Sequence, residues 1–432
     1  IVVYKIRMNK EIINFAKKIL PYPRSITGSG VRKTLKTIKT IVPNLKICKI
    51  KSNTKVFDWK VPLEWKVHEA YIITPDGKKI CDFKKNNLHL VGYSIPINKI
   101  ITKNELEKHL YSLPKQPNAI PYVTSYYKKN WGFCISENIR KKLKKGNYKI
   151  VINTSLFKGV LNYGEILIKG KSKKEVFLSS YICHPSMANN EISGPSVLTF
   201  IAKWINSLKN KKYSYRIIFI PETIGSITYL SKNLKSLKKN MLYGFVISCV
   251  GDDREYSYLQ SRYGNTLSDK VALRVLNSKI KKFKKYNWLS RGSDERQFCA
   301  PGVDLPVCSI LRTMYAMYPE YHTSLDKIGT VVTKKGLNGS YNIYKKCIET
   351  IEKDLIPISN ILCEPQMGKR KLYPNISTKI YPVRTELMMN VLSYCDETNS
   401  VFDISTLCNI PTAKTLRIIN LLYKNKLIRY IK

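Results

Sequence analysis

The chain has 432 residues, of which 44% are hydrophobic, so it is long enough to bury more than one core and we expect two or three domains. No stretch approaches about 18 uncharged apolar residues, and no basic segment followed by an apolar core opens the chain, so we expect neither a membrane-spanning helix nor a signal peptide. The net charge of +45 is carried by short lysine groups along the whole chain. This pattern favours a solvated lysine-rich surface, and a surface that binds an acidic polymer is the alternative.

The eleven cysteines lie between Cys48 and Cys408, and none forms a Cys-x-x-Cys pair. An odd number at scattered positions is not typical of a disulfide framework or of a cysteine-rich zinc site. We therefore expect reduced thiols and a cytoplasmic protein.

The first 54 residues predict two helices, separated by the turn-rich loop Pro21–Gly30. Residues 55–148 contain short β-like runs and turns, among them Pro75-Asp76-Gly77. We expect these residues to form a separate, inserted α+β domain.

From residue 149 to 363, short apolar runs alternate with helical segments. The runs that read as buried strands are Val176–Ile182, Tyr215–Ile220, Tyr243–Val250 and Leu305–Leu311. The alternation predicts an α/β fold with a mixed, largely parallel sheet flanked by helices, built from residues 1–54 and 149–363. In such sheets, sites form in the loops beyond the carboxyl ends of the strands.

Residues 364–432 predict a winged-helix-like domain. The segment Glu364–Ser377 reads as a linker, and three helices and a strand follow it, with a tight turn at Asn409-Ile410-Pro411. Such a module binds DNA in many proteins and is a packing unit in others. The helix after this turn, the presumed recognition helix, is expected to present Lys414 and Arg417 outward, so nucleic acid is an alternative partner.

Polar residues follow several of the predicted strands. His184 ends the first run, Glu222 ends the second, and Asp252 and Asp253 follow the third. Imidazole and carboxylate groups at strand ends could bind a metal, and a buried glutamate could act as a general base. Solvated loop residues are the alternative for each motif taken alone. Two later motifs, SRGSDERQFCAPGV and YPEYHTSLD, add His322.

The order of these motifs between Val176 and Asp326 resembles that of zinc aminopeptidases of the co-catalytic metallopeptidase clan, whose fold also serves glutaminyl cyclases. More closely, the chain is similar to bacterial aminopeptidase-like proteins associated with surface-polysaccharide biosynthesis, which carry an inserted domain and a C-terminal winged helix. The segments that carry this resemblance are YPRSITGSG, WGFC, CHPSMANNEISGP, PETIGS, GDDREYSY and RGSDERQF.

The resemblance implies a role for each motif. His184, Asp253 and His322 would be zinc ligands, and Glu222 would be the general base. Tyr321 would donate a hydrogen bond to an oxyanion. The residues expected to shape the substrate pocket are Arg291, Asp294 and Glu295.

Two positions depart from the pattern of the clan. Asn190 stands where a bridging aspartate is usual, with Glu191 after it, and Thr223 stands where a second glutamate is usual. Because two close dications need carboxylates between them, one zinc ion is favoured over two, with Glu191 or Asp253 supplying an oxygen ligand.

We therefore expect a zinc-dependent amide hydrolase that acts on a small peptide-like or amino-sugar-linked substrate, with a homo-oligomer as one possible assembly. A non-hydrolytic or cyclase-like protein with a single zinc ion is one alternative. A regulatory protein that binds nucleic acid or a polyanion through the winged helix is another.

Overall fold

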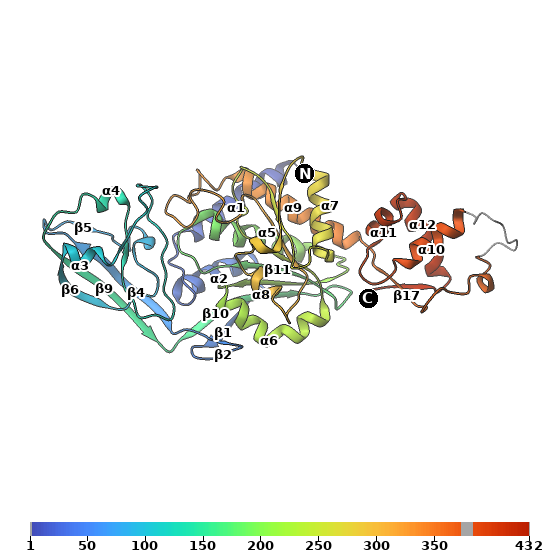
Figure 1. The fold of residues 1–432 in the computed structure, drawn as a ribbon, viewed down its shortest axis with the longest axis horizontal. Helices are drawn as coiled ribbons and strands as arrows, with labels where there is room; N and C mark the ends of the chain where they lie inside the picture. Colours follow the sequence, from blue (N-terminus) through green and yellow to red (C-terminus); the bar gives the residue numbers. More distant parts are fainter. Residues whose placement is uncertain (1, 373–382, 432) are drawn as a thin grey trace.

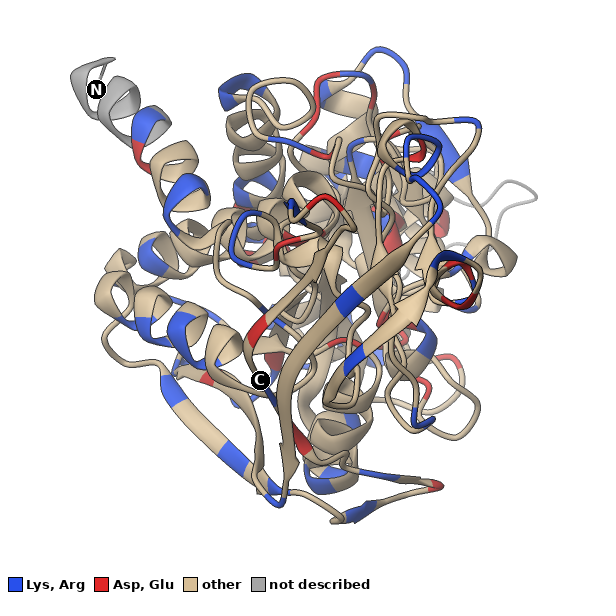
Figure 2. Ribbon diagram, turned by 90° about the vertical axis from the view of Figure 1, so that its left-hand side faces the viewer, with Lys and Arg blue, Asp and Glu red and all other residues tan. Residues whose placement is uncertain are grey.

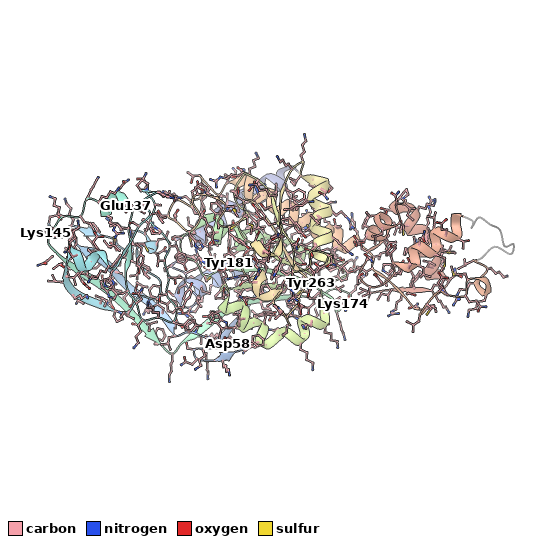
Figure 3. The ribbon with its side chains drawn as sticks, in the orientation of Figure 1. Asp58, Glu137, Lys145, Lys174, Tyr181 and Tyr263 are labelled. Atoms are coloured by element: carbon pink, nitrogen blue, oxygen red, sulfur yellow. The ribbon has the colours of Figure 1, made fainter. Side chains whose placement is uncertain are left out.

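The computed structural model describes residues 2–372 and 383–431. The chain forms three parts in a row, with the inserted domain at one end, a sheet domain in the middle and a small helical domain at the other end (Figure 1). Tyr181 lies in the middle part, whereas Glu137 and Lys145 lie in the inserted domain (Figure 3). Within the described residues, every helix is too short or too polar to cross a bilayer.

Eight strands form the central sheet. In spatial order they are β1 (Lys46–Lys51), β10 (Val160–Ile168), β12 (Ser214–Ile220), β11 (Glu175–Tyr181), β13 (Met241–Val246), β16 (Val307–Leu311), β14 (Ser257–Leu259) and β15 (Lys284–Tyr286). The four strands from β12 to β16 run parallel, while β10 and β14 pair antiparallel with them. The predicted mixed, largely parallel sheet is therefore confirmed.

Helices cover both faces of this sheet, which is why every residue of β11 and β12 is buried. The helices that pack in the core of one face are α1 (Val2–Ile19), α2 (Ser29–Ile41), α5 (Ser193–Ser207), α7 (Leu267–Lys279) and α9 (Lys334–Lys353). The core of the other face includes α6 (Ile224–Asn240) and α8 (Glu295–Phe298). In α5 the apolar residues Val197, Ile201 and Ile205 recur at helical spacing and are fully buried.

The inserted domain is built on an antiparallel sheet with the order β5-β4-β9-β6. These strands are β4 (Glu64–Ile73), β5 (Lys79–Ile80), β6 (Ile97–Thr102) and β9 (Asn147–Phe157). The smaller elements around them are the hairpin β2 (Lys55–Val56) and β3 (Trp59–Lys60), the pair β7 (Leu110–Tyr111) and β8 (Phe133–Cys134), α3 (Lys103–Glu107), α4 (Glu137–Arg140) and the 3-10 turn Asn87–His89. The loop around Tyr122 returns to the central domain, where a β-bridge joins Pro121 to Thr323.

The C-terminal part is a winged helix, as predicted. It contains α10 (Val383–Ser393), α11 (Val401–Leu407) and α12 (Thr412–Lys424), and β18 (Ile428–Tyr430) pairs with β17 (Pro357–Ser359). The last five residues of the predicted linker Glu364–Ser377 lie outside the described residues, which resume at residue 383. Lysine and arginine positions are spread over helices, strands and loops rather than gathered on one element (Figure 2).

Candidate functional site

Three loops at the carboxyl edge of the sheet bring two imidazoles and a glutamate together. His184 follows β11, Glu222 follows β12, and His322 lies in the long loop after β16. Nε2 of His184 lies 3.5 Å from Oε2 of Glu222, and the ring centroids of the two histidines are 5.5 Å apart. Because β11, β12 and β16 belong to the same parallel set, their following loops meet at one edge, as the topology requires.

A buried chain of charged groups supports His184. Its Nδ1 lies 2.8 Å from Oε2 of Glu191, and Nε of Arg24 lies 3.7 Å from Oε1 of the same carboxylate. Nε of Arg24 also donates to the main-chain carbonyl of His184, at 3.0 Å. Burial lowers the pKa of His184, but Cys183 and Glu191 together outweigh it and raise that pKa well above its usual range. When no metal ion is bound, this direction favours a protonated His184 imidazole beside Glu191, although burial raises the pKa of Glu191 as well.

His322 is held by aromatic rings. Its ring stacks on Tyr321 with centroids 3.9 Å apart, and it meets the ring of Tyr122 edge to face at 5.3 Å. Burial and the neighbouring His184 lower the pKa of His322 to about 3, so its imidazole is neutral. Its buried Nε2 has no hydrogen-bond partner among the described residues. A neutral imidazole with a free nitrogen is suited to accept a metal ion.

Asp326 ties the two histidine loops to each other. Its carboxylate accepts the main-chain N–H groups of Asn189, at 2.7 Å, and of Asn190, at 3.0 Å. These two residues belong to the π-helical turn Ala188–Ile192, which leads from the His184 loop into α5. Asp326 itself lies four residues after His322, so one side chain fixes both loops.

Asp253 does not join this cluster. Its carboxylate accepts the hydroxyl of Thr333 at 2.7 Å and lies 3.8 Å from Nη2 of Arg312. The buried acid after β13 is Asp252, which accepts Nδ2 of Asn189 at 3.0 Å. Asp252 thus holds the π-helical turn in place through the side chain of Asn189. Asp253 is bonded to Thr333 instead, so its carboxylate is not among the ligand atoms near His184.

Two of the three residues predicted to shape the substrate pocket are buried, and the third is exposed. Asp294 accepts the N–H of Thr223 at 2.8 Å and so fixes the turn that carries Glu222; burial and the charge of Glu222 raise the pKa of Asp294 to about 8. Glu295 is buried and accepts main-chain N–H groups of its own loop as well as the Tyr315 hydroxyl. Arg291 is exposed and lies over the Trp288 ring, away from the histidines.

Sequence reasoning missed two residues that touch the site. Tyr122 belongs to the inserted domain, meets both histidine rings edge to face, and donates its N–H to the carbonyl of His322 at 2.9 Å. Arg24 belongs to the loop Pro21–Gly30 and is 3% exposed. A buried charge is energetically costly unless an opposite charge pairs with it. The one sequence signal for Arg24 was the segment YPRSITGSG, which is similar to the family but gave no role for its arginine.

The donor atoms of the site fit a zinc ion. Among the described His, Cys, Asp and Glu residues, Cys183, His184 and Glu191 form the one group of three whose ligand atoms lie within 4.8 Å of one another. The nitrogen of His184 next to Cys183 and Glu191 is Nδ1, whereas Nε2 faces Glu222. Two further atoms, Nε2 of His322 and Oε1 of Glu191, are buried without a hydrogen-bond partner in the described part of the chain. Nitrogen, sulfur and carboxylate oxygen are the ligand atoms that zinc takes in proteins.

Comparison with known proteins identifies the family. Residues 13–354 match the model described as a domain of unknown function, DUF4910, and residues 356–430 match a winged helix-turn-helix model. A protein of Clostridium acetobutylicum, named as a candidate polysaccharide biosynthesis protein with an aminopeptidase-like domain, is 42% identical over 423 residues, which are 98% of this chain and 96% of that protein.

Solved structures agree with this placement. The crystal structure of a candidate peptidase from Clostridium acetobutylicum matches with a TM-score of 0.83 and 40% identity, over 99% of this chain and 97% of that one. A zinc aminopeptidase from Bacillus subtilis matches with a TM-score of 0.58 and 13% identity, over 79% of this chain and 95% of that one, which shows a shared fold. The chain belongs to the DUF4910 family, and it joins this domain, which has an aminopeptidase-like fold, to a C-terminal winged helix.

Proposed function

We propose that the chain is a zinc-dependent amide hydrolase that acts on a small peptide-like or amino-sugar-linked substrate in surface-polysaccharide biosynthesis. The observation that carries this proposal is the convergence of His184, His322 and Glu222 from three separate loops. The name of the Clostridium acetobutylicum relative supports the biosynthetic setting.

His184 and His322 would hold one zinc ion. Glu191 bonds to Nδ1 of His184, and this carboxylate–histidine pairing orients metal-binding imidazoles in many proteins. A second ion lacks support because Asn190 and Thr223 offer no carboxylate. A bound zinc ion would supply Lewis-acid chemistry toward an amide carbonyl and an attacking water.

The chain's own residues then perform the proton transfers. Glu222, whose side chain is 20% exposed, is accessible to a substrate; it would take a proton from the attacking water and pass it to the leaving amine. Burial raises the pKa of Tyr321, so its hydroxyl stays protonated and can donate to the carbonyl oxygen. Asp294 would keep Glu222 in place through the N–H of Thr223.

The test combines metal analysis with a substrate panel of aminoacyl amides and N-acylated amino sugars. We expect about one zinc ion per chain, lost in His184→Ala, and a fall in hydrolysis of about 10²- to 10⁴-fold in Glu222→Gln with the zinc retained. Glu320→Gln, which changes an exposed ion pair with Arg254, is the matched control. Full activity of Glu222→Gln would overturn the proposal, and bound zinc without hydrolysis of any substrate would favour the cyclase-like alternative.

A further inference from the structure

A small cavity lies beside the site, between the inserted domain and the loop Pro21–Gly30. Its volume is about 40 Å³, and both parts of the chain line it. The cavity is therefore larger than a single water molecule requires and has room for a small group of non-hydrogen atoms. Pockets at domain junctions are a common place for ligand recognition.

Two residues that line the cavity each carry a buried polar atom without a partner among the described residues. These atoms are Nη2 of Arg24, which comes from the loop, and Oδ1 of Asn87, which comes from the insert. A buried donor or acceptor that makes no hydrogen bond costs about 1–3 kcal/mol. Two such atoms around one cavity therefore suggest a ligand that supplies both an acceptor and a donor.

The pairing of Arg24 favours a neutral ligand beside it, and Lys66, the other charged residue that lines the cavity, is exposed to solvent. Arg24 already has a counter-charge, because its Nε lies 3.7 Å from Oε1 of Glu191. A carboxylate ligand could accept from Arg24 but would leave Oδ1 of Asn87 without a donor and would face the charge of Glu191. A secondary amide offers a carbonyl oxygen to Arg24 and an N–H to Asn87.

An aromatic part of the wall joins the reaction centre, and hydroxyl side chains such as Thr27 and Thr124 line the cavity beside it. Trp65, Phe83 and Tyr122 line the cavity, and they provide an aromatic surface for a methyl group. Tyr122 also meets the rings of His184 and His322 edge to face at 5.3 Å each. Pro185, which follows His184 directly, completes this side.

We propose that this cavity binds the acetamido group of an N-acetylated substrate, with Arg24 and Asn87 as its polar partners. The inference rests on the proposed function in placing the reacting amide at His184 and His322. The acetamido group is a second group of the substrate that binds without reacting. It could belong to an N-acetylated amino sugar or to an N-acetylated peptide.

The experiment measures binding to the full-length Glu222→Gln protein by ligand-observed NMR, so that no turnover is needed. The probes are N-acetylglucosamine, glucose and N-acetylalaninamide. We expect N-acetylglucosamine to bind and glucose to bind at least about tenfold more weakly, since glucose lacks the amide. Binding of N-acetylalaninamide in place of the sugar would assign the acetamido group to a peptide, while equal binding of N-acetylglucosamine and glucose, with none of the peptide, would overturn the proposal.

A variant separates recognition from folding. Asn87→Leu removes the unpaired acceptor at similar volume, so we expect binding of the acetamido probe to fall about tenfold while the melting temperature stays the same or rises. Asn98→Leu changes an exposed asparagine of the insert and should alter neither. Unchanged probe binding in Asn87→Leu would overturn the proposal even if the enzyme hydrolyses amides; conversely, Asn87-dependent binding in a protein that hydrolyses nothing would uphold the cavity and reject the proposed function.

Discussion

Nδ1 of His184 and Oε2 of Glu191 are 2.8 Å apart, and neither side chain is more than 6% exposed. The pair joins the first residue of the candidate metal site to Arg24, 160 positions earlier in the chain. Removal of any one member would leave the others buried without their full set of partners. A change at this pair should therefore affect metal binding, the protonation of His184 and the stability of the fold.

Glu191→Gln should weaken zinc binding by about 10- to 100-fold, the usual cost of losing a carboxylate that orients a ligating histidine. Because Arg24 would lose its counter-charge, the free energy of unfolding should also fall, by about 3–5 kcal/mol for a broken buried pair. Zinc competition with a chromophoric chelator and urea unfolding measure the two effects. Unchanged zinc affinity in this variant would show that Glu191 does not orient His184.

Zinc binding should release about one proton near pH 7. In the metal-free protein the pKa of His184 lies well above its usual range, so the imidazolium must lose a proton before Nε2 can bind a metal, whereas His322 is already neutral. The apparent affinity should consequently fall about tenfold for each pH unit below 7. Calorimetry in two buffers of different ionisation enthalpy counts the protons. A count of zero would mean that His184 is neutral before the ion arrives.

Tyr122 should matter to the site although it belongs to the inserted domain. Tyr122→Ala removes the ring that packs against both histidines, so we expect zinc affinity and hydrolysis to fall about tenfold or more, and Tyr122→Phe to preserve zinc binding. Tyr127→Ala is the matched control, because that ring is 54% exposed in the same loop region. If Tyr122→Ala and Tyr127→Ala behaved alike, the insert would have no part in shaping the site.

The fold and the meeting of His184 with Glu222 were predictable because local patterns determine them, whereas His322 was predicted from the resemblance of its motif YPEYHTSLD. Largely apolar runs such as Tyr215–Ile220 are typical of strands buried on both faces, and parallel strands bring their carboxyl ends to one edge. Polar residues at those ends, His184 and Glu222, therefore meet whatever the lengths of the connecting loops.

Side-chain direction and long-range contacts were not predictable in the same way. Asp252 and Asp253 are adjacent, so one turn of backbone decides which carboxylate is buried, and the structure buries Asp252. Arg24 and Tyr122 reach the site from segments more than 60 residues away from His184 in the sequence. No hydrophobic pattern in the sequence indicates that these two side chains contact the site. Only the folded chain shows that the insert and the first loop close over the histidines.

The junction with the winged helix should give the protein a measurable dependence of stability on pH. Asp354 follows α9, is 1% exposed, and lies 3.3 Å from Arg274, which also pairs with Asp403 of α11. Burial raises the pKa of Asp354 to about 6 from 3.8, despite the opposing effect of Arg274. The folded state thus binds this proton more tightly than the unfolded state, so the stabilising contribution is complete below about pH 4 and is lost as the pH rises to about 6.

The variant Asp354→Asn should not show the loss of stability that the deprotonation of Asp354 causes in the wild type between pH 4 and pH 6. Between pH 4 and pH 6 the wild-type free energy of unfolding should fall relative to that of the variant, by about 1–3 kcal/mol at roughly 1.4 kcal/mol per unit of pKa shift. Urea unfolding at pH 4, 5, 6 and 7 measures the difference. Asp304→Asn, in a more exposed pair with Arg262, should follow the wild-type curve. Parallel curves for wild type and Asp354→Asn would mean that Asp354 is ionised in the folded protein throughout this range, held so by Arg274.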